Sequence, residues 1–123
     1  MTINRIAPGE RMSHSVTYNG VVYLSGVTAA EAGLDIKAQT ARVLAIIDER
    51  LAAAGTDKSK ILSAQIWVRD IAHHFAPMNE EWVKWMDPGN PPARATVESN
   101  MARPEVLVEI KVIAAKLRES DGA

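Results

Sequence analysis

The sequence predicts a two-layer α+β domain in which two helices cover one face of a mostly antiparallel sheet. Several segments alternate apolar and polar residues, as strands do, and two segments repeat apolar residues at helical spacing. The chain has 123 residues, which suffice for one domain with a real core, so residues 1–123 form a single domain. The expected order is β-β-α-β-α-β-β, and the pattern also allows a short strand at residues 2–6.

The first half of the chain predicts a hairpin followed by a helix. Asn19-Gly20 joins two strand-like runs within "SVTYNGVVYLSG", and both residues tolerate positive φ, while Gly26 ends or kinks the second strand. A helix is expected between Asp35 as N-cap and Gly55 just past the C-terminus. Its apolar face comprises Ile36, Thr40, Val43, Leu44, Ile47 and Leu51.

The second half predicts strand, helix and two strands. Residues 60–70 alternate as a strand, and residues 73–86 return to helical spacing. Pro77 fits that helix only if it lies in the first turn. Residues 93–99 and 105–116 form two further strands, with Pro104 in the turn between them.

Composition excludes several classes of protein. Hydrophobic residues make up 47% and charged residues 24%, with a net charge of −1, so neither nucleic acid nor an anionic membrane is an expected partner. The absence of cysteine removes disulfides, thiol nucleophiles and cysteine-ligated zinc. No segment resembles a signal peptide or a membrane span, which favours a cytoplasmic protein.

The last strand indicates self-association. One face carries Val106, Val108, Ile110, Val112 and Ala114. On the other face, Leu107 and Ile113 flank Glu109 and Lys111, so a face that should meet solvent is partly apolar. A second copy of the chain is the economical cover, and we expect a homo-oligomer.

Arg94 is the first candidate for a functional residue. Alternation places Arg94, Thr96 and Glu98 on one strand face, which on this pattern alone is typical of a solvated surface. Pro91 and Pro92 stiffen the preceding loop, however, and an arginine held in a fixed position can bind a carboxylate through two hydrogen bonds.

Glu109 and Asn79 each allow two interpretations. A glutamate among apolar neighbours either pairs with a cation or, with its pKa raised by desolvation, exchanges protons near neutral pH. Asn79 lies beside the apolar face of the second helix, where bonding to a loop carbonyl is commoner than contact with a ligand. His73 and His74 are adjacent and make a poor metal pair, so no metal site is predicted.

Five motifs carry a family resemblance. "NPPARATVESNMARPEVLVEIKVIAA" resembles the C-terminal signature of the Rid family, the reactive intermediate deaminases, also called the YjgF family. "NGVVYLSG" resembles its N-terminal strand motif. Within the family, "RMSHSV", "DKSKILSAQIWV" and "MNEEWVKWM" resemble the YoaB-type branch.

This resemblance implies a chorismate-mutase-like fold, a homotrimer with ligand clefts between subunits, and hydrolysis of reactive 2-imino acids or their enamine tautomers to 2-oxo acids and ammonia. It places the carboxylate-binding arginine at Arg94 and the water-activating glutamate at Glu109. It also places Thr96, Asn79 and Ser25 near the ligand, and it implies no cofactor and no metal.

One position departs from the family pattern. Met12 stands where the imine-hydrolysing branch carries a tyrosine, and methionine cannot donate a hydrogen bond to a substrate. Either the substrate differs, or the chain binds 2-oxo acids or other carboxylates without efficient turnover, as a non-catalytic binding protein of the same fold. The family's endoribonuclease label fits poorly with a near-neutral chain that lacks a basic stripe. A redox-triggered holdase role, also proposed for some members, has no discriminating feature in the sequence.

Overall fold

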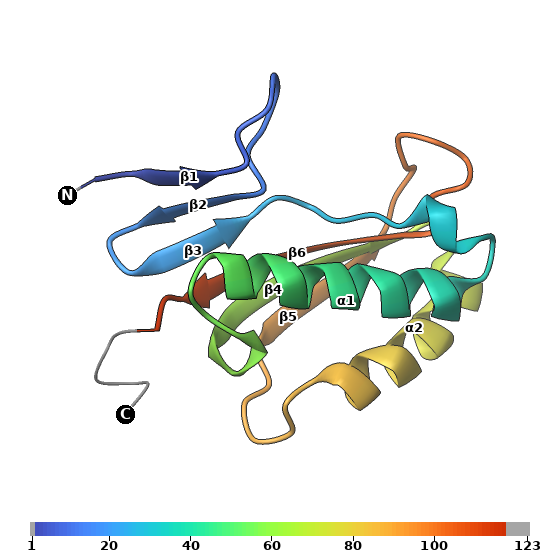
Figure 1. The fold of residues 1–123 in the computed structure, drawn as a ribbon. Helices are drawn as coiled ribbons and strands as arrows, with labels where there is room; N and C mark the ends of the chain where they lie inside the picture. The colour runs from blue at the N-terminus through green and yellow to red at the C-terminus, as the bar shows by residue number, and fades with distance from the viewer. Residues whose placement is uncertain (1, 118–123) are drawn as a thin grey trace.

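A computed structural model describes residues 2–117 of the chain (Figure 1). The strands are β1 Asn4–Ile6, β2 Ser15–Tyr18, β3 Val21–Leu24, β4 Ile61–Val68, β5 Ala93–Glu98 and β6 Val108–Ala115. The helices are α1 Ile36–Ala53 and α2 Ile71–Trp85, and 3-10 turns occur at Ala30–Ala32 and Lys58–Lys60. The predicted element order is confirmed, and the short strand at the N-terminus is present as β1.

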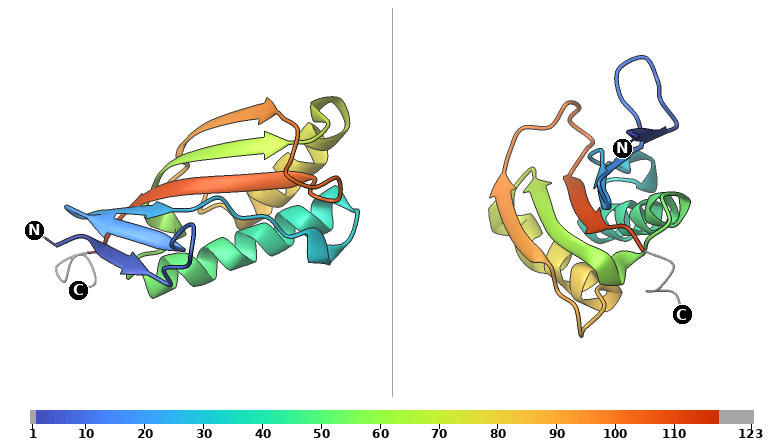
Figure 2. Two further views of the ribbon diagram at one scale, coloured as in Figure 1. Left: turned by 90° about the horizontal axis from the view of Figure 1, so that it is seen from above. Right: turned by 90° about the vertical axis from the view of Figure 1, so that its left-hand side faces the viewer.

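The six strands form one sheet in the order β1-β2-β3-β6-β4-β5. Every neighbouring pair is antiparallel except β4 and β5, which α2 connects as a parallel crossover. Both helices lie on the same face of the sheet (Figure 2), so the predicted two-layer architecture is confirmed. The order puts β3 and β6 in the middle, and β4 lies between β6 and the edge strand β5.

Turn and cap residues act as the sequence predicts. Asn19 and Gly20 adopt φ of 53° and 77°, which the tight β2–β3 turn requires. The carboxylate of Asp35 accepts a hydrogen bond from the backbone N–H of Ala38 at 3.0 Å and caps α1. Gly55 follows the helix with φ of 82°.

The prediction for Pro77 is wrong. Helix α2 begins at Ile71, two residues earlier than expected, so Pro77 is its seventh residue and lies in the second turn. The early start has a tertiary cause, because the Glu98 carboxylate on β5 accepts a hydrogen bond from the Ile71 N–H at 3.1 Å. Proline removes the bond that its N–H would make to the preceding turn, while burial of Met78 and Trp82 holds the helix on the sheet.

The core lies between the sheet and the two helices. The alternate residues of β6 from Val108 to Ala114 are fully buried there, together with Ile66 and Val68 of β4. The opposite sheet face, called here the open face, carries Tyr23, Ser63, Gln65, Trp67, Ala95, Glu109, Lys111 and Ile113. It is partly apolar, as the sequence predicts. Among residues 2–117 no helix is long and apolar enough to cross a membrane.

Candidate functional site

Arg94 lies on the edge strand β5 and points to the helix side of the sheet. It pairs with Ala64 of β4, which is buried beneath the helices, and the two residues share a face. The guanidinium lies over the ring of Trp82 on α2, with Cζ 5.3 Å from the ring centroid. Burial lowers the pKa of Arg94 from its usual value. The ion pairs between described side chains do not include Arg94.

Two buried polar atoms belong to the same side of the sheet. Thr96, two residues after Arg94 on β5, has a buried Oγ1 with no hydrogen-bond partner among the described residues. Asn79, one turn before Trp82 on α2, has a buried Oδ1 that also lacks a hydrogen-bond partner among the described residues. Asn79 also lines a hollow on α2 with the exposed Phe75. We call Arg94, Thr96, Asn79 and Trp82 the arginine cluster.

Glu109 lies on the open face, in a pocket of about 380 Å³ lined also by Met12, Ser25, Gly26 and Lys111. We call this the glutamate pocket. Gly26 makes room for this carboxylate, because a Cβ at this position would overlap Oε2 of Glu109 and lie 3.1 Å from its Cδ, so the side chain would have to move. Backbone bonds between Val27 and Ile110, 2.9 and 3.1 Å long, hold the glycine segment against β6. The carboxylate therefore rests directly on the backbone of the neighbouring segment.

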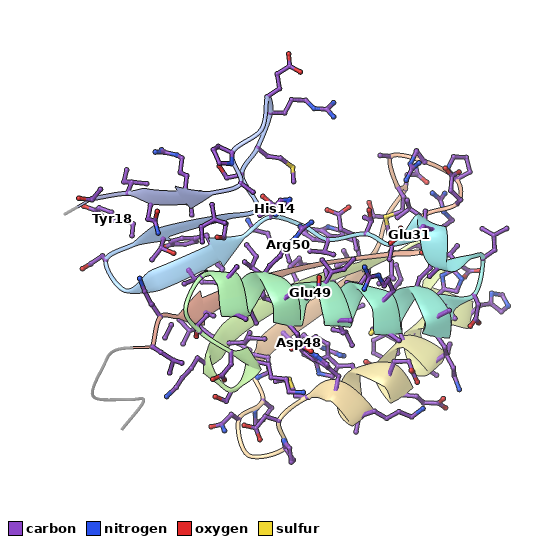
Figure 3. The ribbon with its side chains drawn as sticks, viewed as in Figure 1. His14, Tyr18, Glu31, Asp48, Glu49 and Arg50 are labelled. Carbon is purple, nitrogen blue, oxygen red and sulfur yellow. The ribbon has the colours of Figure 1, made fainter. Side chains whose placement is uncertain are left out.

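Ser25 and Met12 join the glutamate pocket to the β1–β2 loop, residues 7–14, which projects from the body of the molecule (Figure 1). The Ser25 hydroxyl donates a 2.6 Å hydrogen bond to the carbonyl of Ser13, and the Ser25 N–H bonds the carbonyl of His14 at the base of the loop (Figure 3). The Ser25 hydroxyl can still accept a bond from a ligand. Met12 is 53% exposed and also lines the glutamate pocket.

The structure does not bring Arg94 and Glu109 together within one chain. Glu109 pairs with Trp67 of β4, three residues beyond the Arg94 partner Ala64, and it lies on the other sheet face. Two strand spacings and a three-residue offset put the two Cα atoms about 14 Å apart. The candidate residues thus form two separate groups, with Arg94, Thr96 and Asn79 in one and Met12, Ser25 and Glu109 in the other.

Comparison with known proteins identifies the family. The family model described as Endoribonuclease L-PSP matches residues 2–116. The chain belongs to this family. The RutC family protein YoaB of Escherichia coli is 42% identical over 117 residues, covering 94% of this chain and 99% of its own. A RutC family protein of Haemophilus influenzae is also 42% identical, over 93% of this chain and 98% of its own.

Solved structures of Endoribonuclease L-PSP relatives share the fold. The crystal structure of NMB1025, a member of the YjgF protein family from Neisseria meningitidis, is 44% identical and matches with a TM-score of 0.92 over 96% of this chain and 98% of its own. A structure from the Rid protein family, YyfA of Yersinia pestis, is 32% identical, with a TM-score of 0.81 over 91% of this chain and 93% of its own. The Rid or YjgF resemblance and the YoaB likeness are confirmed.

Three residues near the two groups escaped the sequence analysis as parts of a site. Gly26 was interpreted only as a strand end, although its missing side chain makes room for Glu109. Trp82 lies within the second predicted helix, and the helical spacing did not indicate its contact with Arg94. Lys111 lines the glutamate pocket beside Glu109. Among residues 2–117 no three His, Asp or Glu side chains could together hold a metal ion.

Proposed function

We propose that this protein hydrolyses reactive 2-imino acids to 2-oxo acids and ammonia in clefts between copies of itself. One copy supplies the arginine cluster and the next supplies the glutamate pocket. The observation that carries this proposal is the separation of Arg94 from Glu109. In a 2-imino acid the carboxylate is bonded directly to the imine carbon, so two groups about 14 Å apart on opposite sheet faces cannot both serve it from one chain.

Assembly as a homotrimer would also account for the open face. Val97 is 44% exposed and Tyr23 43% exposed there, alongside the half-buried Trp67 and Ile113. An apolar surface of this kind is typical of an interface rather than of a solvated sheet. A ring of three copies closes on itself and repeats the same cleft at each boundary.

In the proposed reaction, Arg94 binds the substrate carboxylate through two parallel hydrogen bonds. Glu109 accepts a proton from water while the water oxygen bonds to the imine carbon, and the C=N π electrons move to nitrogen, which takes up a proton from solvent. Protonation of the amine in the resulting carbinolamine and loss of a proton from its hydroxyl release ammonia and leave the 2-oxo acid. The sum is imine plus water to ketone plus ammonia, and an electrophilic imine needs only positioning and one base.

Mixing two inactive variants tests the proposal. Arg94→Ala and Glu109→Gln are purified separately, combined 1:1 and allowed to exchange subunits. In a mixed oligomer, the copy that supplies the arginine cluster to a cleft has an intact Arg94 with a probability of about one half, and the copy that supplies the glutamate pocket has an intact Glu109 with the same probability. About a quarter of the clefts are then complete, so ammonia release should return to about a quarter of the unmutated level. The substrate is a set of imines generated in place by an amino-acid oxidase.

A matched mixture supplies the control. Arg94→Ala is combined with the double variant Arg94→Ala/Glu109→Gln, which contains no intact arginine, and activity should stay at background. If the first mixture also stays at background after mass spectrometry has shown mixed oligomers, a cleft shared between copies is excluded.

A further inference from the structure

The guanidinium of Arg94 is held next to an aromatic ring, and the ion pairs between described side chains do not include it. Buried or half-buried charges in proteins normally have an oppositely charged partner. Arg94 is half-buried, and the ion pairs between described side chains leave it out. Its documented neighbour is instead the indole of Trp82, which is 6% exposed and therefore fixed in the core.

Trp82 belongs to a column of packed side chains that is hydrogen-bonded at its far end. Trp85 lies against Trp82 with ring centroids 5.5 Å apart at an angle of 54°. Lys58 lies over the other ring, with Nζ 5.3 Å from the Trp85 centroid. The Trp85 indole N–H donates a 2.9 Å hydrogen bond to Asp48, on the side of α1 that faces α2 (Figure 3). Trp82 is thus held by its neighbours and does not depend on Arg94 for its position.

An aromatic neighbour of Arg94 leaves the guanidinium N–H groups free for a ligand, whereas an acidic neighbour would not. A cation–π contact supplies no carboxylate acceptor, whereas an acidic partner would accept hydrogen bonds from the guanidinium N–H groups. A glutamate or aspartate in place of Trp82 would bond those same N–H groups and compete with the substrate carboxylate. Trp82 restrains Arg94 while leaving its hydrogen-bonding fork open.

We propose that Trp82 is the positioning residue that holds the guanidinium of Arg94 ready for the substrate carboxylate. This inference rests on the carboxylate-binding role given to Arg94 in the proposed function, but not on hydrolysis. Restricting the side chain before binding lowers the entropy that is lost when the carboxylate binds. Removing the aromatic face should therefore weaken carboxylate binding more than an equal loss of packing elsewhere in the column.

Three variants separate positioning from packing. Trp82→Phe keeps an aromatic face beside Arg94, and Trp82→Leu removes it. Trp85→Leu removes a similar side-chain volume and the hydrogen bond to Asp48, at a position that has no described contact with Arg94. The probe is 2-oxobutanoate, whose dissociation constant is measured by calorimetry on the intact oligomer. We expect Trp82→Leu to weaken binding about tenfold, Trp82→Phe by less than about threefold, and Trp85→Leu, which removes a support of Trp82 but no contact with Arg94, by clearly less than Trp82→Leu. Melting temperatures should fall in both leucine variants.

The proposal would be overturned if Trp82→Leu and Trp85→Leu weakened binding equally for an equal loss of melting temperature. Unchanged binding in Trp82→Leu would overturn it as well. If Trp82→Leu does not fold, proton NMR of the unmutated protein decides. The Arg94 side-chain signals, identified by their loss in Arg94→Lys, should be shifted upfield by the indole ring current, and unshifted signals would exclude the stacking. A protein that binds 2-oxobutanoate as predicted but releases no ammonia would contradict the proposed hydrolysis and leave the role of Trp82 intact.

Discussion

Arg94 and Glu109 point to opposite faces of the same sheet, from strands β5 and β6 that lie on either side of β4. Neither residue can reach the other within one chain, although each lies in its own group of polar and apolar side chains. A mutation at one of them should therefore leave the surroundings of the other intact. This independence allows binding and turnover to be altered separately.

Replacing Arg94 should weaken binding of the ligand carboxylate. Arg94→Ala is expected to weaken binding of 2-oxo acids by about 2–5 kcal/mol, the range found when one member of a buried charge pair is removed. Arg94→Lys should restore little, because an ammonium cannot reproduce the planar fork. Calorimetry that finds unchanged affinity in both variants would show that Arg94 has only a structural role.

Glu109→Gln should separate catalysis from binding. The substitution keeps the shape of the side chain but removes the base, so hydrolysis should fall by at least about 100-fold while 2-oxo acids still bind. Ammonia release from oxidase-generated imines measures the first effect and calorimetry the second. Full activity in the variant would exclude Glu109 as the base.

An unmutated protein with no activity above background would favour the non-catalytic binding protein. Met12→Tyr then becomes the decisive variant, because it restores the hydrogen-bond donor that the imine-hydrolysing branch carries at this position.

Gly26→Ala should displace the Glu109 carboxylate without unfolding the chain. The added methyl group would overlap Oε2, and a shift of about 1 Å in a reacting group can cost about 100-fold in rate. Gly89→Ala is the matched control, since its Cβ would meet only Asp87 Oδ1 at 4.0 Å. Equal rates in the two variants would mean that the carboxylate position against Gly26 is unimportant.

Gln39 should be a major contributor to stability. Its side chain is fully buried, donates to the carbonyls of Gly33 and Glu105 at 2.8 Å each, and accepts from the Leu107 N–H at 2.9 Å. Gln39→Leu leaves three backbone groups unpaired, so the free energy of unfolding in urea should fall by about 2–5 kcal/mol. The control is Thr40→Val, which loses one bond within its own helix and should cost less than about 1.5 kcal/mol.

Asp70 should make part of the stability depend on pH. A hydrogen bond from His73, 2.7 Å between Nδ1 and Oδ2, lowers the pKa of Asp70 below its usual 3.8. The contribution is therefore present above pH 3.8 and is lost as pH falls through the lower folded pKa. His73→Ala should return the pKa of Asp70 toward 3.8 in an NMR titration, and an unchanged value would exclude the contact in solution.

The sequence predicted most of the fold because its signals are local. The turn at Asn19-Gly20, the cap at Asp35 and the two periodicities each depend on neighbouring residues, and all three are confirmed. The start of α2 could not be predicted in this way, because the Glu98 carboxylate that caps it comes from a strand 27 residues further along the chain.

The candidate site was predictable residue by residue but not as an arrangement. Alternation placed Arg94 and Glu109 on strands, and the family resemblance supplied a hypothesis for their roles. Which faces they occupy depends on the register of β5 and β6 against β4, which no local pattern contains. The space left by Gly26 and the contact of Trp82 with Arg94 are likewise properties of packing, with no counterpart in the spacing of the sequence.

The position of Arg94 on an edge strand also bears on aggregation. An unpaired edge can add strands from other molecules, and proteins resist this with prolines and with charges that point inward. Pro91 and Pro92 offer no N–H just before β5, and Arg94 and Glu98 point to the helix side. A foreign strand added there would have to bury both charges. Replacing Arg94 by an apolar residue should thus make the protein more prone to form fibrils, a cost separate from any effect on ligand binding.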